Sequence, residues 1–391
     1  MDIRKALARD QVSEIFMKTR KAVAPFPAKL EANPYCELLY THIEALGVPV
    51  IKEADFTCRW LIQNRRQVKV LHFHWLAHRY QHWRGGIFSF FTLTVFMGRL
   101  LLALLLRYRL VWTMHNYLPH ESPNRVVDYM ARLLMINLAK VIVHCGPARD
   151  LIANKVIHKK KISVIPHGNY ISVYQNDIGK GEARERLGLP PEAKVFLSFG
   201  LIRGYKGTER LIRDFAGLNL SGAYLLIAGQ PYESAEEEMI KRRGGMSPVN
   251  IQFHLGFIPC QEVQYFFKAA DVAVFPFEQI LTSGSVILSL SFARPVVVPR
   301  LGCMRELEGS GAAILYDNED PEGLSRALGE ALQLDLDLAS KAAFELANDL
   351  DWQKIAQRHI EAYGLRNEKS EIRNPKSKIR IRGSNKRITD K

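Results

Sequence analysis

DVAVFPFEQILTSGSVILSLSFARPVVVPRLGCMRE, residues 271–306, is the stretch that decides the fold. It predicts a buried strand at Val272–Phe275, a turn with the sequence TSGS at 282–285, an apolar helix and a second strand at Pro295–Val298. The first amides of such a helix lack partners inside the helix and carry the positive end of its dipole. With a glycine and two serine hydroxyls beside them, we expect an anion site, suited to a phosphate or diphosphate. The alternative is an ordinary strand, turn and helix with a serine N-cap.

A second glycine-rich turn follows another predicted strand. FGLIRGYKG, residues 199–207, comes after the apolar run Val195-Phe196-Leu197 and before a helix-like segment. Arg203 and Lys206 therefore stand at the carboxyl end of a strand, where open α/β sheets bind their ligands. An arginine fork and a lysine point charge suit a diphosphate leaving group. Solvated charges on a loop are the alternative interpretation.

Strands and helices alternate along the rest of the chain. A first strand is expected at Ala22–Phe26 and a helix at about Cys36–Leu46, and further strands end in LHFHW (71–75), VWTMH (111–115) and VIVH (141–144). This alternation is typical of a parallel, doubly wound sheet. The turn VIPHGN at 164–169 suits a domain boundary. We therefore expect an N-terminal domain at 1–175, a C-terminal domain at 176–350, a helix at 351–365 that crosses back, and a disordered basic tail at 366–391.

Together these motifs resemble a known family. VIPHG, FGLIRGYKG, LLIAGQP (225–231), DVAVFPFE, SGS and ARPVVVPRLGCMRE are similar, in order and spacing, to the GT-B glycosyltransferases of family 4, group 1, over roughly residues 110–345. The resemblance implies an α/β protein with two Rossmann-like, doubly wound domains that face a central cleft. It implies transfer of a sugar from a nucleotide diphosphate sugar to a glycan or lipid-linked acceptor, in polysaccharide or glycolipid synthesis. The nucleotide sugar is a co-substrate, and no further cofactor is expected.

The resemblance also assigns site residues. The donor diphosphate would be held by Arg203, Lys206, Gly204, Ser283, Gly284 and Ser285. Glu278 corresponds loosely to the first glutamate of the family's paired motif, as a catalytic candidate. The second glutamate is missing, because Val286 and Leu288 occupy the positions where it is expected. Retention of configuration and independence of metal are the mechanism that the resemblance implies, and the sequence holds no Asp-x-Asp motif.

Several polar residues at the predicted strand ends of the first domain face the expected cleft. By the resemblance, His115 approaches the donor sugar, and His120 is the second candidate. His72 and His74 lie two apart on a strand and so point to one face, which suits an acceptor or a metal. We expect no metal, since no third ligand accompanies them. Asn116 completes the cleft residues, and buried histidines with backbone partners are the alternative for each ring.

Composition limits the class of protein. The 391 residues carry a net charge of +14, and from Arg366 onward ten Lys/Arg stand against three Asp/Glu. That tail suits anionic lipid or has no role, and nothing interleaves aromatic and basic residues as nucleic-acid binding would. Five scattered cysteines indicate neither a disulfide framework nor a zinc site. With no apolar leader at the N-terminus, we expect a cytoplasmic protein, peripheral on the membrane's inner face.

One apolar segment requires a choice. Residues 87–106, IFSFFTLTVFMGRLLLALLL, are long enough to span a bilayer, but Arg99 would lie near its centre. The segment stands between two predicted strands, which favours a crossover helix within the first domain, with a helix on the membrane surface as the alternative. Two other functions remain open: a non-catalytic membrane-surface scaffold with a degenerate donor pocket, and a GT-B sugar-nucleotide epimerase.

Overall fold

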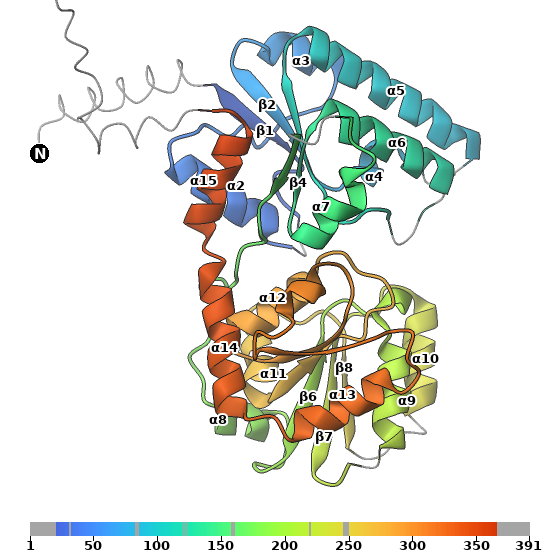
Figure 1. Cartoon of the computed structure of the whole chain (residues 1–391), viewed down its shortest axis with the longest axis vertical. Coiled ribbons are helices and arrows are strands. Elements are labelled where there is room, and N and C mark those ends of the chain that lie inside the picture. Colours follow the sequence, from blue (N-terminus) through green and yellow to red (C-terminus); the bar gives the residue numbers. More distant parts are fainter. Residues whose placement is uncertain are drawn as a thin grey trace, which may run out of the picture.

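A computed structural model of the chain has two α/β domains stacked along its long axis (Figure 1). The structure describes residues 21–30, 33–82, 86–119, 122, 124–157, 161–218, 220–244 and 250–365. The predicted basic tail at 366–391 lies outside the described residues.

The first domain is built on a five-stranded parallel sheet. Its strands lie side by side in chain order. They are short and mostly apolar, as expected for strands covered on both faces. The strands are β1 (Ala22–Phe26), β2 (Val68–Phe73), β3 (Arg109–Thr113), β4 (Lys140–Val143) and β5 (Ile162–Val164).

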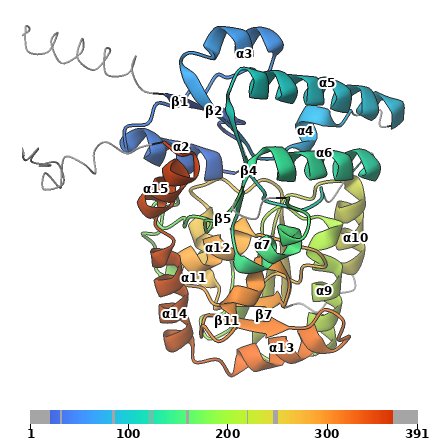
Figure 2. The same cartoon turned by 45° about the horizontal axis from the view of Figure 1, so that its top comes forward.

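Helices cover both faces of this sheet. One face packs against α3 (Cys58–Asn64), α5 (Gly86–Leu105), α6 (Arg125–Leu138) and α7 (Gly146–Ala153), with the short α4 (Ala77–Tyr80) beside α5. The other face packs against α2 (Tyr35–Ala45) and α15 (Trp352–Ala362), which lie side by side in both overall views (Figures 1 and 2). The last described helix therefore completes the core of the first domain.

The apolar segment expected at 87–106 forms α5, which joins β2 to β3 as a crossover helix. Leu93, Phe96, Leu100 and Ala103 are buried against the sheet because they recur at helical spacing. The opposite side of the helix is exposed. Among the described residues, only this helix is long and apolar enough to cross a membrane by length and composition, and 28% of its apolar window is buried.

The second domain is doubly wound. Its six parallel strands lie in the order β11-β10-β9-β6-β7-β8. They are β6 (Lys194–Phe199), β7 (Ala223–Gly229), β8 (Ile251–Leu255), β9 (Val272–Val274), β10 (Val296–Pro299) and β11 (Ala313–Tyr316). The strand order reverses between β6 and β9, and in such sheets the crevice at that reversal is where ligands bind. Both glycine-rich turns singled out in the sequence follow these two strands.

Short helices surround this sheet. The helices are α8 (Lys180–Arg186), η2 (Gly204–Lys206), α9 (Thr208–Gly217), α10 (Ser234–Gly244), α11 (Val263–Ala269), α12 (Gly284–Ser291), η3 (Gly302–Leu307), α13 (Gly323–Leu332) and α14 (Leu336–Asp349). With two parallel, helix-covered sheets, the expected two-domain α/β fold is confirmed.

The chain crosses between the domains twice at one place. Asn169, on the first crossing, accepts a hydrogen bond on its carbonyl from Trp352 Nε1 at 2.7 Å and donates its own N–H to the Leu350 carbonyl at 3.0 Å. Gly168 is required beside them, since a Cβ atom there would lie 2.2 Å from the Trp352 ring. The two crossings are therefore held together as one joint.

The cysteine pattern indicated no disulfide framework, but the structure contains one disulfide. Cys145, which caps α7 in the first domain, is bonded to Cys303 in η3 of the second, with a Cα–Cα distance of 5.5 Å. Beside it, the Gly146 N–H donates to Glu306 Oε1 at 2.7 Å. The two cysteines are 158 residues apart, so only the docking of the domains brings them together, and spacing along the chain gives no sign of it. The disulfide is a second, covalent connection between the domains.

Candidate active site

A cavity of about 320 Å³ lies at the reversal of strand order in the second domain. Its wall combines the turn after β6 with the turn and helix after β9. These turns supply all six residues that the sequence analysis assigned to the diphosphate, five of which line the cavity: Arg203, Lys206, Ser283, Gly284 and Ser285. The sixth, Gly204, lies in the same turn and lines a neighbouring cavity together with Arg203.

Two glycines set the shape of the turn after β6. Gly200 has a φ of +110°, and a Cβ atom there would lie 3.1 Å from Ser285 Oγ and 3.5 Å from Lys206 Nζ. Gly207 has a φ of +70°, and a Cβ atom there would lie 2.0 Å from the Pro276 carbonyl oxygen. These positions require glycine because the backbone is left-handed and another group already fills the space. The two turns therefore approach each other closely, and both Ser285 Oγ and Lys206 Nζ lie beside the Gly200 backbone.

The surroundings of Lys206 disfavour its charged ammonium form. Burial, and then the charge of Arg203, lower its pKa from 10.5 to about 8. A diphosphate beside it would reverse both effects by supplying opposite charge. The cavity is therefore electrostatically suited to an anion.

The start of α12 is capped as an ordinary helix and also faces this cavity. Ser283 is the N-cap, and its side chain accepts a hydrogen bond from the Val286 N–H at 3.3 Å. The alternative interpretation of this segment, a plain serine cap, is therefore realised. It does not exclude the anion site, since Ser283, Gly284 and Ser285 all line the cavity.

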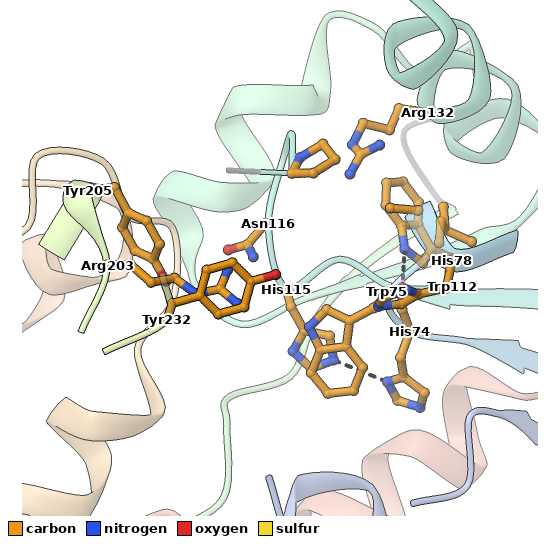
Figure 3. Close-up of a pocket in the computed structure, with 13 residues that line it drawn as sticks. His74, Trp75, His78, Trp112, His115, Asn116, Arg132, Arg203, Tyr205 and Tyr232 are labelled. Atoms are coloured by element: carbon orange, nitrogen blue, oxygen red, sulfur yellow. Dashed lines mark hydrogen bonds between the residues drawn. The ribbon is translucent and has the colours of Figure 1, made fainter. Parts of the chain in front are cut away.

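A second cavity, of about 370 Å³, lies between the two domains. Figure 3 shows its residues: His74, Trp75, Trp112, His115 and Asn116 come from the first domain, and Arg203, Tyr205 and Tyr232 from the second. The Arg203 guanidinium lies 3.7 Å from the centre of the Tyr232 ring. Arg203 and Tyr205 line both cavities, so the anion cavity and the interdomain cavity share a wall.

The predicted histidines divide into groups. His74, His115 and Asn116 line the interdomain cavity. His72 lies beside His74, with ring centres 4.3 Å apart, but it is fully buried and bonded to Tyr40 and Thr113, so it does not reach the cavity. His120 lies outside the described residues. Among the residues that the structure describes, no group of three or more His, Cys, Asp or Glu could hold a metal ion.

Glu278 lies away from these histidines. It is exposed, lines a third cavity with Arg203 and Arg213, and donates its backbone N–H to the Tyr205 carbonyl at 2.8 Å. Glu278 does not line the anion cavity or the interdomain cavity.

Two histidines that sequence reasoning did not select also belong here. His144 and His167 follow β4 and β5, and each is buried within 6 Å, ring centre to ring centre, of another histidine. The signal that could have found them is their position: each stands just after a parallel strand, as His74 and His115 do. The carboxyl edge of the first sheet therefore carries a row of histidines facing the second domain.

Comparisons with known proteins agree with this geometry. Residues 193–334 match the family model described as glycosyl transferases group 1. A GDP-mannose:glycolipid 4-beta-D-mannosyltransferase of Xanthomonas campestris pv. campestris is 27% identical over 371 residues, which cover 88% of this chain and 94% of the relative. A D-inositol 3-phosphate glycosyltransferase of Corynebacterium urealyticum is 26% identical over 220 residues, covering 53% of this chain and 51% of the relative.

Solved structures share the fold. The chain resembles Anabaena HepE in complex with UDP (TM-score 0.66, 16% identity, covering 88% of this chain and 99% of that one). It also resembles WaaG, a glycosyltransferase involved in lipopolysaccharide biosynthesis (TM-score 0.60, 15% identity, covering 87% and 98%). The second domain therefore matches the group 1 glycosyltransferases, and the chain as a whole has the GT-B fold and is similar to the glycosyltransferases named here.

Proposed function

We propose that this glycosyltransferase moves a hexose from a nucleoside diphosphate sugar to a lipid-linked glycan at a membrane surface. The anion cavity at the reversal of strand order carries the proposal, because Arg203, Lys206 and the start of α12 converge there. The diphosphate would lie in that cavity, and the sugar would extend past Arg203 and Tyr205 into the interdomain cavity. The acceptor would enter from the side of the first domain.

We propose that no metal takes part. Two cationic side chains and a helix N-terminus can neutralise the departing diphosphate, which is the task that a divalent ion performs elsewhere. Turnover is then unchanged by EDTA. A loss of turnover that Mg²⁺ or Mn²⁺ restores would contradict this part of the proposal.

Two observations lead to different expectations for the anomeric configuration of the product. The resemblance to family 4 implies retention, whereas the full-length relative is named for a β-linked product. From a donor whose sugar is α-linked, a β-linked product requires inversion by a single displacement. We infer inversion, since the second glutamate of the retaining family's motif is replaced by Val286 and Leu288 here. The anomeric configuration of the product, read by NMR, decides between them.

In this inferred reaction, the acceptor hydroxyl oxygen bonds to the anomeric carbon while the bond from that carbon to the diphosphate oxygen breaks. The electron pair of the broken bond leaves with the diphosphate, next to Arg203 and Lys206. The hydroxyl proton passes to a base on the opposite side of the sugar. His115, on the first domain's side of the interdomain cavity, is the proposed base.

We infer that an apolar surface on the first domain meets the membrane. The α5–α6 face is a set of exposed apolar residues on two helices that lie side by side (Figure 2): Ile87, Phe91, Leu101 and Leu105 on α5, and Val126, Tyr129, Met130 and Leu133 on α6. Arg99, within α5, and Arg107, just after it, add positive charge to this region of the chain. A glycolipid acceptor, as in the name of the full-length relative, requires an enzyme that reaches the bilayer surface.

A membrane-binding assay tests the α5–α6 face. The double variant Phe91→Glu, Leu101→Glu should lose binding to vesicles of anionic phospholipid with unchanged thermal stability, because both side chains are exposed. Leu338→Glu, at an exposed position of α14 in the second domain, is the matched control and should bind as wild type does. Equal binding by all three proteins would rule out this face. We propose that this face meets the cytoplasmic leaflet of the membrane.

The donor assignment is tested by thermal shift against UDP, GDP, ADP and CMP and their sugars, followed by product analysis with glycolipid acceptors. Lys206→Ala should lose the stabilisation given by the preferred nucleotide. Lys341→Ala, at an exposed position on α14, also removes one positive charge and should keep the stabilisation by the nucleotide. No stabilisation by any nucleotide would favour a non-catalytic scaffold, and an epimerised nucleotide sugar without transfer would favour an epimerase.

A further inference from the structure

Six buried side chains at the carboxyl edge of the first sheet form one hydrogen-bonded chain. Thr113 Oγ1 contacts His72 Nε2 at 2.8 Å, and His72 Nδ1 contacts the Tyr40 hydroxyl at 2.7 Å. The Tyr40 hydroxyl also contacts His74 Nε2 at 2.6 Å. The chain goes on from His74 Nδ1 to His115 Nε2 at 3.1 Å, and from His115 Nδ1 to His144 Nε2 at 3.3 Å. It ends where His144 Nδ1 meets the Ile165 carbonyl oxygen at 3.0 Å.

The backbone carbonyl at the end fixes which ring nitrogen carries the proton in His144, His115 and His74. Burial lowers the pKa of His74 and His115 well below 6.5 and that of His144 to about 4, so at neutral pH each ring is uncharged, with one donor and one acceptor nitrogen. The Ile165 carbonyl can only accept, so His144 donates through Nδ1 and accepts through Nε2. His115 must then donate through Nδ1.

The same reasoning continues along the chain. Because His115 donates through Nδ1, its Nε2 carries the lone pair and accepts from His74 Nδ1–H. His74 Nε2 accepts from the Tyr40 hydroxyl. From Tyr40 onward, the protons all point towards β5. Trp75, stacked on the His115 ring with centres 4.3 Å apart and planes 6° apart, holds that ring in place.

We propose that His144 is a positioning residue that fixes His115 as the Nδ1–H tautomer, so that His115 Nε2 is the lone pair that takes the acceptor's proton. This inference rests on the proposed function. The acceptor hydroxyl would replace His74 as the donor to Nε2, and both histidines line the interdomain cavity where it would bind. The proton from the hydroxyl bonds to Nε2, which makes His115 an imidazolium. Its Nδ1–H still donates to His144 Nε2. Transfer of this proton to His144 Nε2 would move the positive charge from His115 to His144.

Two variants of His144 separate hydrogen bonding from mere packing. His144→Gln places an amide oxygen where Nε2 stood, so it can still accept from His115, whereas His144→Leu cannot. We expect His144→Leu to lower kcat by about 100-fold and His144→Gln to bring kcat back to within about tenfold of wild type. Nucleotide affinity should be unchanged in both, because His144 does not line the anion cavity.

His359→Gln is the matched control. His359 is equally buried and bonded to a backbone carbonyl, that of Ile355, but its Nε2 has no hydrogen-bond partner among the described residues, so it is outside the chain. It should keep wild-type kcat. A wild-type kcat in His144→Leu, or equal losses in the Gln and Leu variants, would overturn the proposal.

The tautomer can be read without any substrate. In protein labelled with ¹⁵N in its histidine rings, the couplings of His115 should report a proton on Nδ1 and none on Nε2, and His144→Leu should remove that preference. An Nε2–H His115 in the wild type overturns the inference whatever the enzyme's activity. A wild-type chain that transfers no sugar from any nucleotide, with His115 still the Nδ1–H tautomer, refutes the proposed function instead.

Discussion

Donor affinity should fall as the pH rises above about 8, through the loss of charge on Lys206. Its pKa of about 8 in the empty cavity makes the side chain about nine-tenths charged at pH 7 and about one-tenth charged at pH 9. A diphosphate favours the charged form and raises that pKa, so the complex keeps its proton while the free protein loses it. The affinity for the nucleotide sugar should therefore drop about tenfold between pH 7 and pH 9, or about 1.4 kcal/mol.

Isothermal titration calorimetry measures this effect in two ways. The affinity gives the tenfold change, and the dependence of the heat on the buffer's ionisation enthalpy gives the proton uptake, which should approach one per complex at pH 9. Lys206→Met is the control, because it removes the titrating group while any ionisation of the nucleotide base stays. A wild-type affinity that is constant over this range, or an equal fall in Lys206→Met, would refute the placement of Lys206 against the diphosphate.

Three further variants, one of them with a control variant, test the framework around the site. Cys303→Ser should lower the free energy of unfolding of the oxidised protein by about 2–4 kcal/mol in denaturant titrations, with no difference from wild type once both are reduced. Gly207→Ala should abolish nucleotide-induced stabilisation, because the added Cβ atom would clash with the Pro276 carbonyl oxygen. Gly217→Ala, at a position in α9 with open space around it, is the control. It should leave the free energy of unfolding unchanged or raise it by up to about 1 kcal/mol. Asp271→Asn should cost about 3–5 kcal/mol in the same titrations, because Arg184 would keep a buried charge without its partner at 2.9 Å, and a cost below 1 kcal/mol would contradict that reasoning.

Local patterns predicted much of the fold. β1 begins and ends at the expected residues, α5 lies within one residue of its expected bounds, and α15 lies within three. These elements follow from apolar periodicity and capping, which act over a few neighbouring residues. The position of the candidate donor site, at the ends of β6 and β9, could also be predicted from the sequence. Ligands of open parallel sheets bind at the carboxyl ends of the strands, and both glycine-rich turns follow predicted strands.

The features that could not be predicted from the sequence depend on contacts between segments that are far apart along the chain. The Cys145–Cys303 bond needs the two domains to be docked. His72 was correctly expected to share a face with His74, yet Tyr363, 291 residues away along the chain, contacts its Nδ1 and helps to enclose it. The hydrogen-bonded histidine chain likewise joins three separate strands, and nothing in the local sequence of any one of them marks the connection.

Helix α15 also has a consequence for the order in which the protein is made. Trp352, Ile355 and Ile360 pack into the core formed by α2 and the first sheet, so the residues that complete the first domain leave the ribosome after the whole second domain. The second domain, from α8 to α14, is continuous in sequence and can close its core before then. The first domain is therefore the first to be synthesised in part, but its core is completed only after the second domain has left the ribosome. A nascent chain halted before Trp352 would present an unfinished first domain to chaperones and proteases.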